Sequence, residues 1–599
     1  MSSSAPATTL LDPISFEVLR AAFTATCNEM ALVVAKTAYS TPVNEGHDFA
    51  GGLYDHHGQL VSQGEFDLPA FVGLTILTVP EVIRQIGREN MEPGDIYIIN
   101  DPYVASTHCN DIHFIKPIFV DGELLAFTSS TAHWSDVGGV VAGSLNCAAR
   151  SHFEEGMRIP AITLFRRGEM NHDIVALLLH NMRQSWERLG DLNAQVAAVR
   201  AGEERIRVLI ARHGVASVRA AMAEVQNYSE RLARAAFSSL PDGVYTAEDH
   251  VDQDVHTGER KTIRLDFVVQ GDHAVFDLTR SDGAAESGIN CTIAACTSAI
   301  FIGLAAVLPP MPMNAGVMRA VEIKARRGSI VWAQPPVGIS GLAITSMDAT
   351  TGAAMLAVGQ ALPERAVGLP SAIVNSTFAG ADTRPTFDAP FINYIWAFGG
   401  TGGTKYKDGS NTLASPFGAS STNIPCELQE RRYPVLYWVH QLLPDSGGPG
   451  ETRGGCGLEQ LIEPSLPGSL SNICNREKQG PAGIFGGGSG WTSRLVVNPD
   501  TENETNLGTF AVNVPVGPGA KLSFWSNGAG GYGDPLDRPT DRILNDIRDG
   551  YLTVPAAREQ YGVVVRERDR RRLEYVVDAG ATDRLRGEMR SARAAQTVR

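Results

Sequence analysis

Residues 100–139 read NDPYVASTHCNDIHFIKPIFVDGELLAFTSSTAHWSDVGG, and this stretch decides the expected fold around it. The apolar run Ile96–Ile99 just before it predicts a buried strand, and two further strands are expected at 112–119 and 124–130. Asp121-Gly122 separates these last two strands, and an Asp-Gly pair between apolar runs strongly favours a β-hairpin. We therefore expect antiparallel pairing here.

The same stretch holds His108, Asp111, His113 and His133. Imidazole nitrogens and carboxylate oxygens are the usual protein ligands of zinc, iron and manganese. The expected hairpin would bring the segment with His108 and Asp111 alongside the segment with His133. His-x-x-Asp followed by a distant His is not a metal signature by itself, so the alternative is a set of hydrogen-bonded structural residues, above all for His113.

The chain has 599 residues, enough for three or four ordinary domains or two large ones. Its 43% hydrophobic and 20% charged residues are typical of a globular protein. The net charge of −15 argues against nucleic acid and against an anionic membrane surface as partners, and favours a cytoplasmic enzyme. Residues 1–13 do not resemble a signal peptide, and no uninterrupted apolar run reaches the length of a membrane span.

The eight cysteines include no C-x-x-C pair, and their loose spacing does not resemble a disulfide framework. Cys109 lies beside the candidate ligands; we interpret it as a small buried residue, with a nucleophile or ligand as the alternative. Glycine clusters lie near 399–403, 447–450, 486–490 and 528–533. None matches a phosphate-binding loop, so we expect tight turns and close backbone approaches and no nucleotide site.

Periodicity predicts a helix from Asp12-Pro13 to about residue 38, helices across 173–239, antiparallel strands across 243–278, and a strand at 315–323. The expected fold class is α+β, with mixed, mostly antiparallel sheets, helical segments, and a β-rich and loop-rich C-terminal half. Four divisions are expected: 1–240, a metal-site α/β domain with a helical segment; 241–365, an α+β meander; 366–540, a Gly-rich β/loop domain; and 541–599, a helical tail.

Several blocks occur in a recognisable order over about residues 10–565. They include Thr37-Ala38-Tyr39-Ser40 leading to Asp48-Phe49, Asn100-Asp101-Pro102 with His108 and Asp111, Ala132-His133-Trp134-Ser135, Glu155-Gly156-Met157-Arg158, and Gly530-Gly531-Tyr532-Gly533-Asp534-Pro535. In these blocks the chain resembles the hydantoinase B family. That family includes the second subunits of ATP-dependent N-methylhydantoinase, 5-oxoprolinase and caprolactamase, and related subunits of acetone and acetophenone carboxylases.

The resemblance implies a catalytic metal site made by Asp48, His108, Asp111 and His133. It adds Asp48 to the cluster found from the residues alone and leaves out His113. Two histidines and two aspartates suit zinc, with manganese and iron as alternatives. One departure is local: many family members carry an Arg shortly before the first Asp, where this chain has Gly46-His47. The roles of His47, Cys109 and His113 stay open.

The resemblance also implies a division of labour within a hetero-oligomer. A separate A-type subunit uses ATP to phosphorylate the substrate oxygen, and the B-type chain completes the reaction at its metal. The expected function is a metal-dependent subunit of a cyclic-amide hydrolase that opens a hydantoin, 5-oxoproline or lactam ring. The alternatives are a subunit of a ketone carboxylase, and a scaffold with a structural metal.

Overall fold

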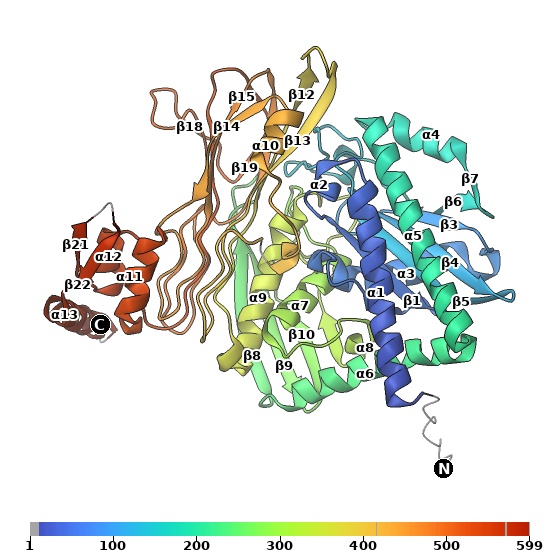
Figure 1. The fold of residues 1–599 in the computed structure, drawn as a ribbon, viewed down its shortest axis with the longest axis horizontal. Helices are drawn as coiled ribbons and strands as arrows, with labels where there is room; N and C mark the ends of the chain where they lie inside the picture. Colours follow the sequence, from blue (N-terminus) through green and yellow to red (C-terminus); the bar gives the residue numbers. More distant parts are fainter. Residues whose placement is uncertain (1–10, 415, 570–571, 598–599) are drawn as a thin grey trace.

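The computed structural model describes residues 11–414, 416–569 and 572–597. The described residues form an α+β fold with mostly antiparallel sheets, as predicted. Figure 1 shows the helix-covered first part of the chain on one side and the β-rich later part on the other. The expectation about a signal peptide concerns residues that lie almost entirely outside the described part.

The predicted hairpin belongs to a seven-stranded antiparallel sheet within residues 49–170, with the order β2-β1-β5-β4-β3-β6-β7. Its strands are β1 Phe49–Asp55, β2 Leu60–Gln63, β3 Ile96–Ile99, β4 Asp111–Val120, β5 Glu123–His133, β6 Ile162–Arg166 and β7 Glu169–Met170. Asp121 and Gly122 join β4 to β5 with φ of 50° and 83°. Two positive φ values are those of a type I′ turn, so the hairpin prediction is confirmed.

Both faces of this sheet are buried, which explains the continuous apolar run of β3. Ile96 and Ile98 pack in a cluster with residues of α1 (Pro13–Thr37) and α5 (Ser185–His213). Tyr97 and Ile99 pack in a second cluster with residues of α3 (Val72–Ile86). As predicted, α1 starts at Pro13, and the Asp12 carboxylate caps it by accepting from the Ile14 amide at 3.0 Å. The helices of this part are α1 Pro13–Thr37, α2 Thr41–Asn44, α3 Val72–Ile86, α4 His172–His180, α5 Ser185–His213 and α6 Val215–Ser238.

A second sheet has the order β11-β10-β9-β8, and α9 packs on β8 and β9 while α7 packs on α9. The elements are β8 Gly243–Val251, β9 Lys261–Gln270, β10 His273–Asp277, α7 Ile293–Val307, α8 Ala315–Met318, β11 Val321–Lys324 and α9 Ser346–Ala361. The strand expected at 315–323 is wrong in its first half. Asn314 accepts from the Gly316 amide at 2.9 Å and starts the short helix α8 instead.

Two antiparallel sheets of the later part face each other as a sandwich, in the orders β13-β12-β16-β19 and β14-β15-β20-β17-β18. Phe378 and Phe391 of one sheet and Ile462 and Phe524 of the other share one buried cluster. The elements are β12 Val374–Asp382, β13 Ala389–Ala397, α10 Cys426–Arg432, β14 Val435–Leu442, β15 Leu458–Pro464, β16 Gly468–Ile473, β17 Arg494–Val497, β18 Thr505–Asn506, β19 Phe510–Val516 and β20 Leu522–Trp525.

The glycine clusters lie in extended segments that pack backbone against backbone beside this sandwich (Figure 1). A Cβ at Gly402 would lie 1.8 Å from the Gly368 carbonyl oxygen, and one at Gly528 would lie 1.7 Å from that of Ser446. The Gly403 amide donates to the Gly530 carbonyl at 2.9 Å. At these positions close backbone approach, and not a tight turn, explains why the residue is glycine.

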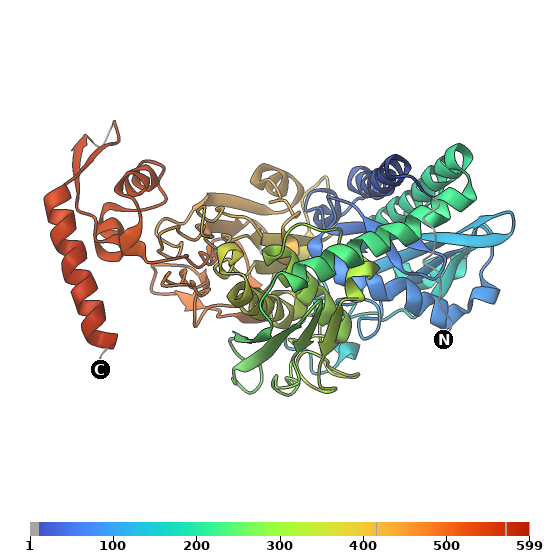
Figure 2. The same ribbon diagram turned by 90° about the horizontal axis from the view of Figure 1, so that it is seen from below.

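The described residues from 540 to 597 form a small unit at one end of the molecule (Figure 2). It consists of α11 Thr540–Arg548, α12 Val554–Tyr561, β21 Val565–Asp569, β22 Glu574–Val577 and α13 Ala579–Thr597. The helices were expected and the hairpin β21–β22 was not. Arg538 is fully buried beside the unit, where its guanidinium pairs with Asp408 at 2.6 Å and with Asp546 at 2.7 Å. This network joins the C-terminal unit to the glycine-rich segments.

Three described helical segments are long and apolar enough to cross a membrane by length and composition alone, although polar residues interrupt their apolar runs. They are Pro13–Thr37, Pro69–Ile86 and Leu342–Ala361, with 39%, 50% and 89% of their most apolar windows buried inside the protein. The apolar character of the last is accounted for by its packing between β8 and α7.

Candidate metal centre

Three neighbouring strands bring the predicted ligands together. Asp111 is the first residue of β4 and pairs directly with His133, the last residue of β5. Asp48 precedes β1, which pairs with β5 on its other side, and the His133 amide donates to the Asp48 carbonyl at 3.0 Å. His108 lies in the connection from β3 to β4. The prediction that the hairpin would bring His108 and Asp111 alongside His133 is therefore confirmed.

His108, Asp111 and His133 are buried, and one potential ligand atom of each lies within 4.8 Å of the others. Nδ1 of His108 is 3.1 Å from Oδ2 of Asp111, and Nδ1 of His133 is 3.1 Å from Oδ1 of the same carboxylate. Burial lowers the pKa of His108 to about 4 and also lowers that of His133. Both imidazoles are therefore neutral near pH 7, and neutral imidazole is the form that binds a metal.

Tyr394 of β13 defines the tautomer of His133. Its hydroxyl faces the carbonyl oxygens of Ser135 at 3.1 Å and Gly143 at 3.0 Å, and donates its single proton to these. The same hydroxyl therefore accepts from Nε2 of His133, 3.3 Å away, which places the imidazole proton on Nε2. The Nδ1 lone pair then faces the Asp111 carboxylate, and two acceptors this close need a proton or a cation between them.

Two more buried polar atoms at this point lack a hydrogen-bond partner among the described residues. They are Oδ1 of Asp48 and Nδ1 of His108, whose approach to Asp111 does not have hydrogen-bond geometry. Burial raises the pKa of Asp48 to about 7 and that of Asp111 to about 6. A divalent cation would satisfy the orphaned atoms and balance the two carboxylates, so the four residues fit a metal ion.

His113 has a supporting position behind the cluster. Its Nδ1 lies 2.7 Å from the Thr131 hydroxyl, and its Nε2 lies 3.1 Å from the Ser106 hydroxyl. The Ser106 oxygen is also 3.1 Å from the His108 carbonyl and 2.9 Å from the Asp111 carbonyl. Burial lowers the pKa of His113 to about 3, so the ring is neutral. The geometry makes His113 a residue that braces the loop between the two candidate ligands.

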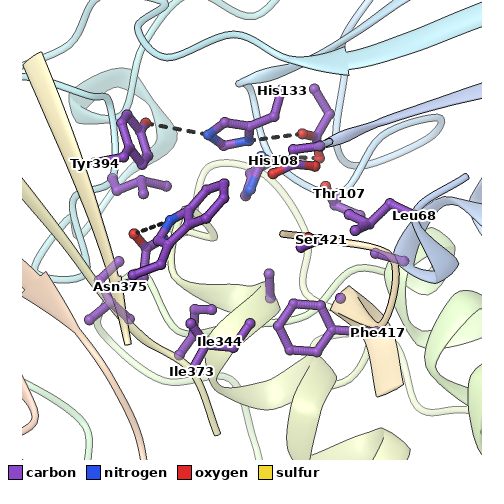
Figure 3. A pocket seen from close by; sticks show the side chains of 18 of the residues that line it. Leu68, Thr107, His108, His133, Ile344, Ile373, Asn375, Tyr394, Phe417 and Ser421 are labelled. Carbon is purple, nitrogen blue, oxygen red and sulfur yellow. Dashed lines mark hydrogen bonds and ion pairs between the residues drawn. The ribbon is translucent and has the colours of Figure 1, made fainter. Parts of the chain in front are cut away.

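The cluster forms one end of a pocket (Figure 3). Asp48, His108, Asp111 and His133 all line it, so Asp48 shares the space even though its carboxylate lies outside the tight group of three. The other described lining residues are mainly apolar or aromatic: Leu68, Ala70, Phe71, Leu145, Ala343, Ile344, Ile373, Tyr394, Trp396, Phe398, Phe417 and Ile473, with Thr107, Ser340, Asn375, Gly418 and Ser421.

Other residues considered from the sequence do not line this pocket. Cys109 is buried, and desolvation raises the pKa of its thiol well above the usual value, so it is not an activated nucleophile. His47 packs against Phe49 with ring centroids 5.7 Å apart. Sequence reasoning missed Tyr394, Trp396 and Asn375, which come from strands more than 200 residues away. Alternating aromatic residues in 391–398 indicate a strand, but no local signal connects it to the cluster.

Comparison with known proteins identifies the family of this chain. A family model described as Hydantoinase B/oxoprolinase matches residues 12–535. The chain belongs to the hydantoinase B/oxoprolinase family. The beta subunit of caprolactamase from Pseudomonas jessenii is 32% identical to it, over 93% of this chain and 96% of that protein. The B-type chain of a putative D-/L-hydantoinase from Pseudomonas sp. (strain NS671) is 29% identical, over 93% of this chain and 95% of that protein.

Solved structures of two other proteins share the fold of this family member. The crystal structure of ATP-dependent caprolactamase from Pseudomonas jessenii matches with a TM-score of 0.86 and 30% identity, over 96% of this chain and 100% of that chain. Nucleotide-free acetone carboxylase also matches with a TM-score of 0.86, at 20% identity, over 98% of this chain and 84% of that chain. At that identity the second match concerns the fold alone.

Proposed function

We propose that this chain is the metal-dependent subunit of an ATP-dependent cyclic-amide hydrolase that opens a hydantoin, 5-oxoproline or lactam ring. The observation that carries the proposal is the convergence of Asp48, His108, Asp111 and His133 at the end of an apolar pocket. The whole-length similarity to one chain of a caprolactamase supports the same reaction class. The named relatives are subunits, which supports a hetero-oligomer with a separate A-type ATPase that phosphorylates the substrate.

In this proposal the four residues hold one divalent metal, with zinc preferred and manganese and iron as alternatives. When bound, such a metal lowers the pKa of a water molecule and polarises the substrate. Tyr394 orients His133 through the Nε2 proton, and His113 and Ser106 hold the loop that carries His108. The apolar walls exclude bulk water from the substrate, so that polar interactions within the pocket are strengthened.

The alternative proposal is a subunit of an ATP-dependent ketone carboxylase. It is supported by the shared fold with acetone carboxylase and by a pocket whose apolar walls also suit a ketone. The two reactions differ in their products. A carboxylase consumes bicarbonate or CO2 with the ketone, whereas the hydrolase yields a ring-opened amino acid without them.

The first test is the metal content of the purified chain, measured by elemental mass spectrometry. We expect about one zinc, manganese or iron per chain in the wild type and a loss in His108→Ala. His180→Ala is the matched control, because His180 is exposed on α4 and distant in sequence from the cluster. An equal metal content in all three proteins, or none in any, would contradict the metal site.

The second test is ring opening with ATP and the co-expressed A-type subunit. We expect Asp111→Asn to abolish product formation while the circular dichroism spectrum stays that of the wild type. Removing the metal with a chelator should stop the reaction, and adding zinc or manganese should restore it. Turnover that requires bicarbonate would favour the carboxylase, and activity that survives metal loss would exclude the proposed chemistry.

A further inference from the structure

Helix α1 (Pro13–Thr37) is apolar on two sides. Its inner side, which includes Leu19, Phe23 and Met30, is buried in the core. Its outer side carries a second row of apolar residues, of which Ile14 is 77% and Leu32 55% exposed. Figures 1 and 2 show α1 and α5 side by side on an outer face of the molecule. The apolar character of α1 therefore exceeds what its packing within the chain requires.

The outer row has the spacing of a seam between two helices. Its members follow one another at alternating intervals of four and three residues: Ile14, Val18, Ala21, Ala25, Asn28 and Leu32. All of them except half-buried Asn28 are exposed. An average interval of 3.5 residues is that of the a and d positions of a coiled coil. A surface helix normally keeps its outer face polar, so this row indicates that another helix packs on it.

We propose that the outer row of α1 is an interface between two copies of this chain, in which the two α1 helices pack antiparallel across a two-fold axis. The proposal goes beyond the proposed function and does not depend on it, because the row is formed by residues that do not line the metal-site pocket.

The sizes of the residues in the row are self-complementary. If the two-fold axis passes α1 between Ala21 and Ala25, Ala21 of one copy lies opposite Ala25 of the other. The same axis places Ile14 opposite Leu32 of the second copy. Small residues at the centre let the two helices approach closely, and large residues fill the space at both ends. A two-fold interface requires such a match, because both sides are the same surface.

The charges on α1 also suit a second copy. The chain has a net charge of −15, so two copies repel each other over most of their surfaces. The two carboxylates of α1 are exceptions, because Glu17 pairs with Arg20 at 2.8 Å and Glu29 pairs with Arg205 of α5. Lys36 adds a positive charge near the end of the helix. The outer face of α1 is therefore a surface on which two acidic copies can meet.

The remaining neighbours of the row fit an apolar interface. Oδ1 of Asn28 accepts from the Glu65 amide at 2.6 Å, so the polar member of the row brings no unpaired oxygen into the contact. Just beyond α1, Tyr39 packs on Trp186 of α5 with ring centroids 6.1 Å apart, and both side chains are more than half exposed. This pair widens the apolar surface beyond a single helix of about 38 Å. A surface of this size supports a dimer of moderate affinity.

The first test is sedimentation equilibrium of the purified full-length chain. We expect a reversible dimer of twice the 64.1 kDa mass of the chain, with a dissociation constant of about 1–10 µM. Leu32→Glu should weaken the dimer at least about tenfold, because the two-fold axis places two unpaired carboxylates in one apolar contact. Added salt should strengthen the wild-type dimer, because it screens the repulsion between acidic copies.

Val244→Glu is the matched control, because Val244 is an exposed apolar residue on the distant strand β8. It should leave the dissociation constant unchanged. Circular dichroism establishes that both variants are folded, which is expected because both positions face solvent. A chain that stays monomeric at about 100 µM would overturn the proposal. So would a monomer in which Leu32→Glu weakens only the binding of a co-expressed A-type subunit, and the row would then belong to that interface.

The second test reads out the antiparallel arrangement by disulfide cross-linking. Cys426→Ser is the background, since the other seven cysteines are buried. We expect oxidation of a mixture of Ile14→Cys and Leu32→Cys chains to give a cross-linked dimer, and neither variant to cross-link when it is alone. Cross-linking of each variant with itself would show parallel helices, and a dimer without any cross-link in the mixture would place the interface elsewhere. Either result would overturn the proposed arrangement.

Discussion

At the scale of single residues, the candidate centre depends on neighbours that bind no metal themselves. His133 is held by the Tyr394 hydroxyl, and the loop with His108 is held by Ser106 and His113. Such partners set the tautomer and orientation of a ligand before the metal arrives. Their removal should weaken metal binding without removing a ligand.

Tyr394→Phe removes the oxygen that accepts the Nε2 proton of His133. We expect zinc affinity to fall about 10- to 100-fold, because the free imidazole can adopt the other tautomer and other orientations. Competition with a chelator measures the change. Tyr437→Phe is the matched control, since the Tyr437 hydroxyl bonds to Gln429 and neither residue lines the pocket. An unchanged affinity in Tyr394→Phe would show that the hydroxyl does not define the tautomer.

Glu155 predicts a pH dependence of stability. Burial raises its pKa to about 8 from an ordinary value of 4.5, although its Oε1 accepts from the Ile339 and Ser340 amides at 2.5 and 2.8 Å. Because the folded-state pKa is the higher one, its contribution to stability is complete below about pH 4.5 and is lost as the pH rises through 8. The slope is about 1.4 kcal/mol per pH unit within this window.

Glu155→Gln keeps an oxygen acceptor and removes the titration. We expect the difference in melting temperature between pH 5 and pH 8 to be smaller in this variant than in the wild type. Glu286→Gln, on the exposed surface, is the control and should retain the wild-type difference. The same pH response in Glu155→Gln and the wild type would refute the assignment.

At the scale of elements, the glycine-rich segments pack against one another backbone on backbone. Their glycines permit one backbone to lie on another at distances that a Cβ would prevent. Gly528→Ala should therefore destabilise the fold by about 1–3 kcal/mol, as overpacking in a rigid interior does. Thermal or denaturant unfolding measures this loss.

Gly587→Ala in α13 is the matched substitution, because open space surrounds that position and alanine favours a helix. We expect it to be neutral or slightly stabilising. If Gly528→Ala were equally harmless, the segments would have to move apart at little cost, and close backbone packing would not explain the clusters.

At the scale of the whole molecule, the pocket combines residues at the edge of the first sheet, residues 340–344 just before α9, and residues of the sandwich. The C-terminal unit lies at the far end and has its own small core, which includes Ile543, Leu552 and Tyr561. It is held partly by buried Arg538. We therefore expect a substitution that destabilises the C-terminal unit to leave metal binding at the centre unchanged.

Arg538→Ala removes the partner of half-buried Asp408, whereas Asp546 keeps its ion pair with Arg453 at 3.1 Å, so we expect a loss of about 1–3 kcal/mol. We expect faster hydrogen exchange in residues 540–597 and unchanged zinc content. Arg566→Ala removes an exposed ion pair with Asp578 in the same unit and serves as the control. Uniformly faster exchange throughout the chain, including β4 and β5, would contradict independent behaviour.

Sequence by itself determined the local features of this protein. The Asp121-Gly122 turn, the capped start of α1 and the grouping of His108, Asp111 and His133 follow from neighbouring residues, because turns, caps and strand pairing across a hairpin depend on short-range geometry. The addition of Asp48 came from family resemblance, not from spacing. The strand expected at 315–323 was wrong in its first half, because the Asn314 side-chain cap outweighed the apolar pattern there.

Only the tertiary structure decided what surrounds that cluster. Tyr394, Asn375 and Trp396 reach it from two strands of the distant sandwich, and the glycine clusters are explained by segments that meet far apart in the chain. The physical reason is that periodicity records which residues are buried, but not which distant element buries them. The tautomer of His133 and the uncharged walls of the pocket both depend on those distant partners.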